Sequence, residues 1–404
     1  MIESLERKLY SWISRLGATA NLVVGSLCER ERQYAPQKRF AVRSAILEKL
    51  ADYIGPEKFS ASRMLLIIFG FYIFTGALSN VPILFPLEWS FGVALLMVSA
   101  VAVGYGGRLW KMEKKLPFHA PNYDFWAGIF VLGILGLLLN YMQIGIPLFT
   151  PVARAYYHNP LWSVSMIFYV MGMTMTAIKN KERKVFLPFA ALSVLLSVFS
   201  GFRTDLVIFV IPLVFFFYLQ NRGRGTGFLA SVLAVCIVGL LAIKCLLTIF
   251  GGSVLGVEEL SFARTGFGLY VLSVMVKNVG LFGLTYGRVW LESFLLQFFG
   301  YPIAPIGAIA SEMVINAARS HSSTFVGPFY LEFGIIGVIL GSIIVGFFCE
   351  LPHRIYRATR NSFFLGLYAI NLSILLVWVD TGIVQYYLAF LFFAIGLWCL
   401  KWAR

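Results

Sequence analysis

Charged residues are scarce in this chain. Asp, Glu, Lys and Arg make up only 13% of its 404 residues, whereas hydrophobic residues make up 59%. Soluble domains carry about 25% charged residues, so this composition excludes an ordinary soluble enzyme. Many apolar runs approach the roughly 20 residues that cross a bilayer as a helix, and they lack the polar–apolar alternation of membrane-barrel strands. The sequence therefore predicts an all-α, polytopic integral membrane protein.

Cysteine and metal-binding patterns are also sparse. The five cysteines do not pair up in any predicted outer loop, so we expect no disulfide framework. Neither a CxxC nor an HExxH spacing occurs, which argues against a protein-built metal site. The first 30 residues lack a clean apolar core and a small-residue cleavage site, so no cleavable signal peptide is expected.

Two domains are predicted. Residues 1–63 form a charged cytoplasmic arm whose apolar residues recur at helical spacing. That pattern is typical of an amphipathic helix on an anionic membrane surface, and equally of a helical hairpin covering the ends of the membrane helices. Residues 64–404 form a transmembrane domain with ten apolar runs, at about 64–84, 88–106, 125–145, 161–178, 185–200, 205–220, 227–250, 325–349, 363–380 and 383–400.

Positive charge is distributed unevenly between the two predicted sides of the membrane. With the N-terminus inside, the inner segments hold 26 Lys and Arg residues and the outer segments hold 6. Because positive residues are retained on the cytoplasmic side, both termini are predicted to be cytoplasmic. Segment 251–325 then becomes a large, partly helical extracytoplasmic loop. The same retention explains the net charge of +14 without nucleic acid as a partner.

The few outer charges are candidates for substrate binding. Arg203 and Asp205 lie in Ser-Gly-Phe-Arg-Thr-Asp, at the turn between two apolar runs. Arginine offers a planar fork of donors that matches phosphate oxygens two at a time. The alternative is an Arg203–Asp205 pair at a helix start, with Asp205 near the positive end of the helix dipole.

The large loop adds arginines beside glycines and aromatic residues. Arg264, Arg288 and Arg319 are candidates for binding phosphate, and Tyr286 is a candidate for stacking on a sugar. The alternative is that these side chains pack the loop's own short helices. As a group they favour a substrate-binding role more than each does singly.

His321 and Glu332 are the candidate catalytic residues. They lie at the junction between the loop and the next apolar run. Histidine exchanges protons near neutral pH, and a carboxylate can accept a proton from a hydroxyl group. A charge inside a membrane helix is costly and usually has a partner or a role. A buried structural Glu332 bonded to the loop is therefore an equal alternative to a catalytic one.

Two patches resemble a known family. A loop with Arg319 and His321 leads into Phe-Tyr-Leu-Glu-Phe-Gly-Ile-Ile-Gly at 329–337, and Ser-Gly-Phe-Arg-Thr-Asp occupies 200–205. With the large external loop between them, they resemble the oligosaccharide repeat unit polymerases (Wzy-type O-antigen polymerases) and, more distantly, the O-antigen ligases. The arm is not part of the usual family pattern.

The resemblance implies a transmembrane polymerase domain of the helical C type (GT-C) of glycosyltransferase. It would join oligosaccharide units carried on a polyprenyl diphosphate lipid, such as undecaprenyl diphosphate, at the outer face of the cytoplasmic (inner) membrane. No metal, other cofactor or nucleotide sugar is implied. The named arginines, Asp205 and Tyr286 would bind diphosphate and sugar, and His321 or Glu332 would handle the acceptor's proton. Membrane lipids and chain-length regulator and flippase proteins are the implied partners in building a cell-envelope polysaccharide.

Three rival interpretations stay open. An O-antigen-ligase-like transferase would use a different acceptor, and the ligases carry an outer-loop histidine placed like His321. A lipid-linked oligosaccharide flippase would place its charges near the bilayer midplane and show internal repeats, neither of which is evident here. A scaffold of a glycan-assembly complex would act chiefly through the arm.

Overall fold

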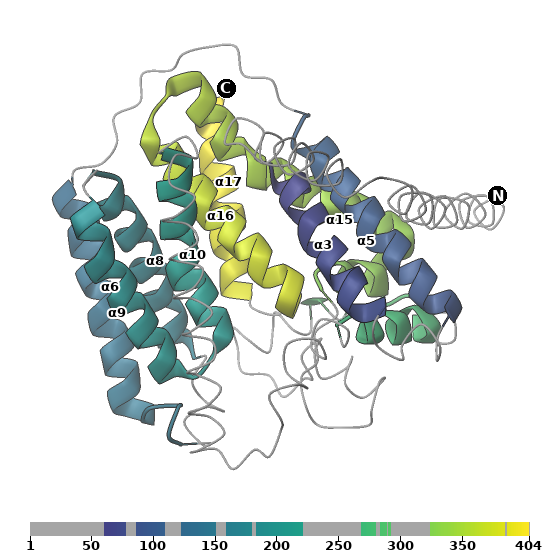
Figure 1. Ribbon diagram of the computed structural model, residues 1–404, viewed down its shortest axis with the longest axis horizontal. Helices are drawn as coiled ribbons and strands as arrows, with labels where there is room; N and C mark the ends of the chain where they lie inside the picture. Colours follow the sequence, from purple (N-terminus) through teal and green to yellow (C-terminus); the bar gives the residue numbers. More distant parts are fainter. Residues whose placement is uncertain are drawn as a thin grey trace, which may run out of the picture.

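The computed structural model describes residues 60–77, 86–109, 123–150, 159–179, 183–220, 268–279, 283–288, 290–291, 324–383 and 386–403. These residues form helices and no strand, which confirms the all-α prediction for the described part of the chain (Figure 1). Residues 1–59 of the arm, the apolar run at 227–250 and most of segment 251–325 lie outside the described residues.

The following described helices overlap predicted apolar runs. They are α3 (Ala61–Ala77), α5 (Pro86–Gly106), α6 (Tyr123–Ile144), α8 (Pro160–Lys179), α9 (Arg183–Ser200), α10 (Arg203–Gln220), α15 (Val326–Thr359), α16 (Ser362–Thr381) and α17 (Tyr386–Ala403). Helix α15 extends ten residues beyond the predicted end of its run at 349. Five of them, α5, α6, α8, α15 and α16, are long and apolar enough to cross a membrane. The chain is thus a membrane protein, while ten spans and the GT-C fold stay predictions.

The helices form two groups that meet at α16. On one side α6 packs on α8, and α9 packs on α10; on the other α3 and α15 both pack on α5. α16 contacts α8, α10, α15 and α17 and lies between the groups (Figure 1). Within the apolar stretch that could cross a membrane, 89% of the residues of α16 are buried, against 33% of those of α6. Apolar residues exposed on α6 are expected in a lipid-facing helix, because lipid rather than water covers them.

Small residues let these helices approach closely. A Cβ added to Gly133 of α6 would lie 2.4 Å from the backbone nitrogen of Tyr169 in α8. A Cβ on Gly346 of α15 would lie 2.0 Å from the carbonyl oxygen of Val103 in α5. Lipid offers no hydrophobic drive for helix association, so such close backbone packing is what holds membrane helices together.

The long helix α15 is broken near its start. Phe333 (φ −134°, ψ 17°) and Gly334 (φ 61°, ψ −147°) leave helical geometry, so Val326–Glu332 forms a separate half-helix. The Gly334 conformation is one that essentially only glycine adopts. The carbonyl of Leu331 accepts the N–H of Thr285 at 3.2 Å, and that of Glu332 accepts the N–H of Tyr286 at 3.0 Å. A segment far earlier in the chain thus satisfies carbonyls at the break.

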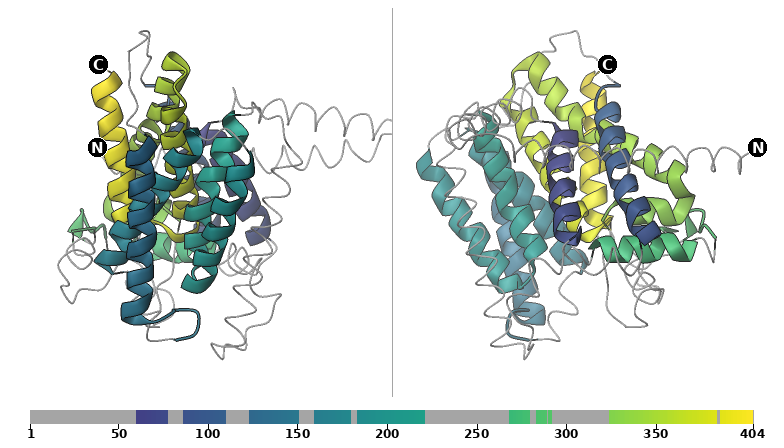
Figure 2. Two further views of the ribbon diagram at one scale, coloured as in Figure 1. Left: turned by 90° about the vertical axis from the view of Figure 1, so that its left-hand side faces the viewer. Right: turned by 45° about the vertical axis from the view of Figure 1, so that its right-hand side comes forward.

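Part of the predicted loop is a buried helix, Gly268–Val279. Leu269, Leu272 and Met275 in it are fully buried. The Leu269 side chain lies near Gly76 of α3, and Leu272 lies near Gly92 of α5. In the right-hand view of Figure 2 this green helix runs across the ends of α3 and α5. It therefore covers those helix ends and brings residue 278 close to the break in α15.

Candidate functional site

The carboxylate of Glu332 is the centre of a polar network at the α15 break. The Glu332 side chain is fully buried. Its Oε2 accepts the Thr285 hydroxyl at 2.6 Å and also the backbone N–H of Gly287. Its Oε1 accepts the backbone N–H of Trp290 at 2.8 Å. We call these four residues the Glu332 network. Both carboxylate oxygens are thereby occupied, which satisfies the requirement for burying a charge.

The partner segment folds as a tight turn because of its glycines. Gly283 (φ 84°) and Gly287 (φ 87°) adopt left-handed conformations that glycine tolerates best, and Tyr286 between them has φ 48°. The N–H of Leu291 then donates to the carbonyl of Gly287 at 3.0 Å, closing one helical turn. The Glu332 carboxylate lies at the start of that turn and accepts backbone N–H groups there, as a capping carboxylate does.

Trp290 anchors the same turn through its side chain. Its ring packs on Phe329 of the α15 half-helix, with ring centroids 5.2 Å apart. The Tyr386 hydroxyl at the start of α17 donates to the Trp290 carbonyl at 3.4 Å. The turn is therefore held against two helices by both polar and apolar contacts.

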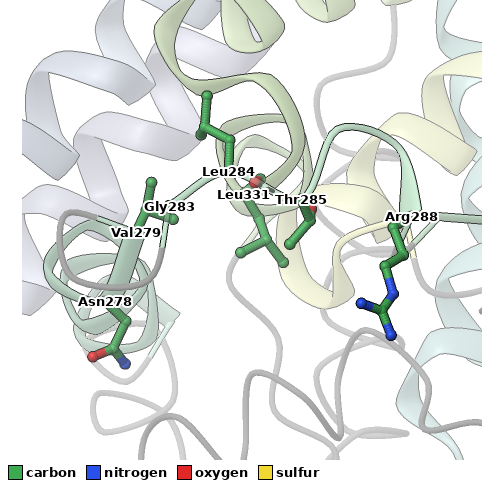
Figure 3. A pocket seen from close by; sticks show the side chains of 7 residues that line it. All are labelled: Asn278, Val279, Gly283, Leu284, Thr285, Arg288 and Leu331. Carbon is green, nitrogen blue, oxygen red and sulfur yellow. Dashed lines mark hydrogen bonds between the residues drawn. The ribbon is translucent and has the colours of Figure 1, made fainter.

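A pocket opens beside this turn. Its volume is about 370 Å³, and it is lined by Asn278, Val279, Gly283, Leu284, Thr285, Arg288 and Leu331. Figure 3 shows Asn278 at one side and Arg288 at the other, with Leu331 and Thr285 between them. These lining residues include one cation and no carboxylate, because Glu332 turns to the loop backbone instead. An apolar floor with a guanidinium, an amide and a hydroxyl fits a polar, anionic ligand.

The family model for O-antigen polymerases matches residues 56–393. The chain belongs to the O-antigen polymerase family. It is also similar to Uncharacterized protein MJ0419 of Methanocaldococcus jannaschii, with 21% identity over 266 residues, which are 65% of this chain and 72% of that protein. No solved structure matches the chain.

Membership of the O-antigen polymerase family assigns the chain to polysaccharide biosynthesis. The family suggests a glycosyltransferase-like enzyme, and it implies a lipid-linked oligosaccharide as substrate in a setting of membrane lipids. Among the described residues, no group of three or more His, Cys, Asp or Glu side chains is arranged to hold a metal ion.

Three predicted site residues of this O-antigen polymerase family member come together. Tyr286, Arg288 and Glu332 meet where the turn contacts the α15 break. Tyr286 is 74% exposed, so its ring is available for a ligand while its N–H is bonded to α15. Arg288 is exposed and lines the pocket. Glu332 has the loop-bonded geometry that was one of its two sequence-based interpretations.

The remaining predicted residues lie elsewhere or outside the described part. Arg203 is the first residue of α10, and only its backbone is described. Asp205 is fully buried in the first turn of α10. Arg264, Arg319 and His321 lie outside the described residues.

Sequence reasoning missed four residues of the site. Asn278 lines the pocket, Thr285 and Gly287 bind the Glu332 carboxylate, and Trp290 anchors the turn. A signal for the turn was present in Gly-Leu-Thr-Tyr-Gly-Arg at 283–288, where two glycines bracket a polar segment. Nothing in the sequence indicated that this turn would meet a carboxylate more than 40 positions away.

Proposed function

We propose that this protein polymerises polyprenyl-diphosphate-linked oligosaccharide repeat units at the outer face of the cytoplasmic membrane. The observation that carries the proposal is the pocket beside the α15 break, which Arg288 lines together with the amide of Asn278 and the hydroxyl of Thr285. In the reaction, the bond between the sugar's anomeric carbon and the lipid diphosphate oxygen breaks. A new bond forms between that carbon and a hydroxyl oxygen at the non-reducing end of the next unit.

Arginine side chains bind the departing diphosphate in this proposal. Negative charge grows on the leaving diphosphate in the transition state, and preorganised donors there lower the barrier. Arg288 supplies a planar fork of N–H groups at the pocket. Arg203, Arg264 and Arg319 are proposed as further ligands of the diphosphate, and Asp205 as a further substrate-binding residue. The exposed ring of Tyr286 provides an apolar face for a sugar.

The hydroxyl group of the acceptor sugar loses its proton to a base, and we propose His321 or Glu332 as that base. A base must come within hydrogen-bond reach of the hydroxyl group. Three donors already occupy both oxygens of the buried Glu332 carboxylate. That arrangement favours His321 as the base and leaves a supporting role for Glu332.

Polymer length tests the proposal directly. Purified protein in liposomes would be given a lipid-linked repeat unit, and the products would be sized. We expect a ladder of polymers with the intact protein and only single units with Arg288→Ala. Arg357→Ala is the matched control, because Arg357 is an exposed arginine at the other end of α15, and it should give the normal ladder.

Two other outcomes would overturn the proposal. Transfer of preformed glycan to a lipid acceptor, with no ladder, would indicate the O-antigen-ligase-like reaction. Movement of the lipid-linked unit across the bilayer without any new glycosidic bond would indicate a flippase.

A further inference from the structure

We infer that Glu332 is a positioning residue for Arg288, and that it holds the diphosphate-binding guanidinium in place without itself touching the substrate. The inference rests on the proposed function. It concerns the Glu332 network and the pocket beside it, and it assigns a distinct role to each of the two charged residues.

The hydrogen bonds of Glu332 bracket Arg288 in the chain. The carboxylate accepts the N–H of Gly287, immediately before Arg288, and that of Trp290, two positions after it. Arg288 itself donates its N–H to the carbonyl of Thr285 at 3.1 Å. The backbone on both sides of Arg288 is therefore fixed by one buried carboxylate. Because a guanidinium fork binds phosphate only in a defined orientation, fixing this backbone fixes the binding geometry.

The carboxylate in turn is fixed by the break in α15. The Glu332 carbonyl accepts the N–H of Tyr286, so main chain and side chain of one residue both bind the turn. Gly334 allows the helix to leave its course directly after that pair of contacts. The half-helix Val326–Glu332 thus ends with the hydrogen-bond acceptors for the turn already in position.

The same geometry keeps Glu332 away from a substrate in the pocket. Its side chain is fully buried and is absent from the pocket lining, whereas Arg288 is exposed and lines it. A proton acceptor would have to leave its three donors before reaching a hydroxyl group. A charge held by three donors is instead suited to organising the groups around it.

A double-mutant cycle on ligand affinity tests this inference. Undecaprenyl diphosphate would be titrated into the purified protein in nanodiscs, for the intact chain, Arg288→Ala, Glu332→Gln and the double variant. A glutamine amide can accept only part of the three hydrogen bonds, so the turn should loosen. We expect each single change to weaken binding about tenfold or more. The double variant should bind no more weakly than Arg288→Ala alone.

Two further variants keep the test independent of folding. Gly287→Ala leaves the carboxylate intact but strains a residue at φ 87°, where an added Cβ meets only Phe333 at 3.7 Å. It should reproduce the affinity loss of Glu332→Gln. Glu350→Gln is the matched control, because Glu350 is a buried glutamate of the same helix that does not line the pocket. This variant should bind undecaprenyl diphosphate as tightly as the intact chain does.

The outcomes separate the inference from the function on which it rests. Additive losses in the cycle, or normal affinity of Glu332→Gln with abolished turnover, would overturn the positioning role and leave Arg288 as a diphosphate ligand. Normal affinity of Arg288→Ala would instead overturn the diphosphate site and the proposed function with it.

Discussion

Two buried glutamates on α15 stand in contrasting surroundings. Glu332 and Glu350 are 0% and 8% exposed, and each accepts hydrogen bonds from distant parts of the chain. The partners of Glu332 come from one irregular turn beside a pocket and a helix break. The partners of Glu350 come from regular helices. Irregular backbone at membrane depth is tolerated where it is buried in protein or lines a cavity, and at the Glu332 end such backbone lies beside a pocket.

The Glu350 network ties helix ends together. The Glu350 carboxylate accepts the N–H of Ala61, the first residue of α3, at 2.5 Å and the Tyr368 hydroxyl of α16 at 3.2 Å. His353 Nδ1 lies 3.4 Å from its other oxygen, and the His353 ring stacks on Tyr368 with centroids 4.5 Å apart. These four residues form the Glu350 network. Burying a paired carboxylate between regular elements serves stability, and none of these four residues lines the pocket beside the α15 break.

The largest expected effect is a difference in the rate of polymer formation between variants of the two glutamates. Glu332→Gln should lower the rate of polymer formation about 10²-fold, because a misplacement of about 1 Å in a binding group costs that much. Glu350→Gln should leave the rate within about twofold. The measurement is chain extension by purified protein in liposomes. Equal losses in both variants would show that the two networks do not differ in function.

The second prediction concerns stability, and here the effect is expected at Glu350. Glu350→Ala leaves the Ala61 N–H and the Tyr368 hydroxyl without their acceptor in a buried site. Each buried donor left unsatisfied costs about 1–3 kcal/mol. The free energy of unfolding, measured by denaturant titration in mixed micelles, should fall by at least that amount. An unchanged midpoint would remove the structural role assigned to Glu350.

A third, smaller effect is expected at the α15 break. Gly334→Ala places a side chain at φ 61° and ψ −147°, a conformation that costs about 1–3 kcal/mol for residues other than glycine. The added Cβ would lie 3.7 Å from Leu284, which lines the pocket, so space is sufficient and only strain acts. The affinity for undecaprenyl diphosphate should fall, while the Glu350 network should stay as stable as in the intact chain. Gly70→Ala in α3, where an added Cβ meets nothing within 4 Å, is the control.

The contrast between the Glu332 network and the Glu350 network also shows which features the sequence could predict and which it could not. Apolar runs near membrane length predicted the helices, because lipid forces the backbone to bond within each segment. The glycines at 201 and 382, with φ 68° and 71°, lie at the two tight connections that the run boundaries indicated. Glu332 was singled out because a charge at the start of an apolar run needs a partner.

The partners themselves could not be predicted. Thr285 and Gly287 are joined to Glu332 by contacts between segments far apart in the chain, which no local pattern encodes. The break at Gly334 was hidden because glycine is common in membrane helices and only a few of them break. Glu350 was missed as well, since it falls at the predicted inner boundary of its run, where an exposed charge is ordinary.

The smallest effect tests a single hydroxyl of the Glu350 network. Tyr368→Phe removes the donor at 3.2 Å from Glu350 but keeps the ring that stacks on His353. A hydrogen bond of this kind contributes about 1 kcal/mol net, so the unfolding free energy should fall by about that amount. Tyr356→Phe is the matched control, because its ring also stacks on His353, at 6.3 Å, and its hydroxyl donates to no described residue. Turnover should be normal in both variants. A loss of turnover in Tyr368→Phe alone would mean that the Glu350 end is coupled to the reaction along α15, and the division between a functional and a structural carboxylate would then be wrong.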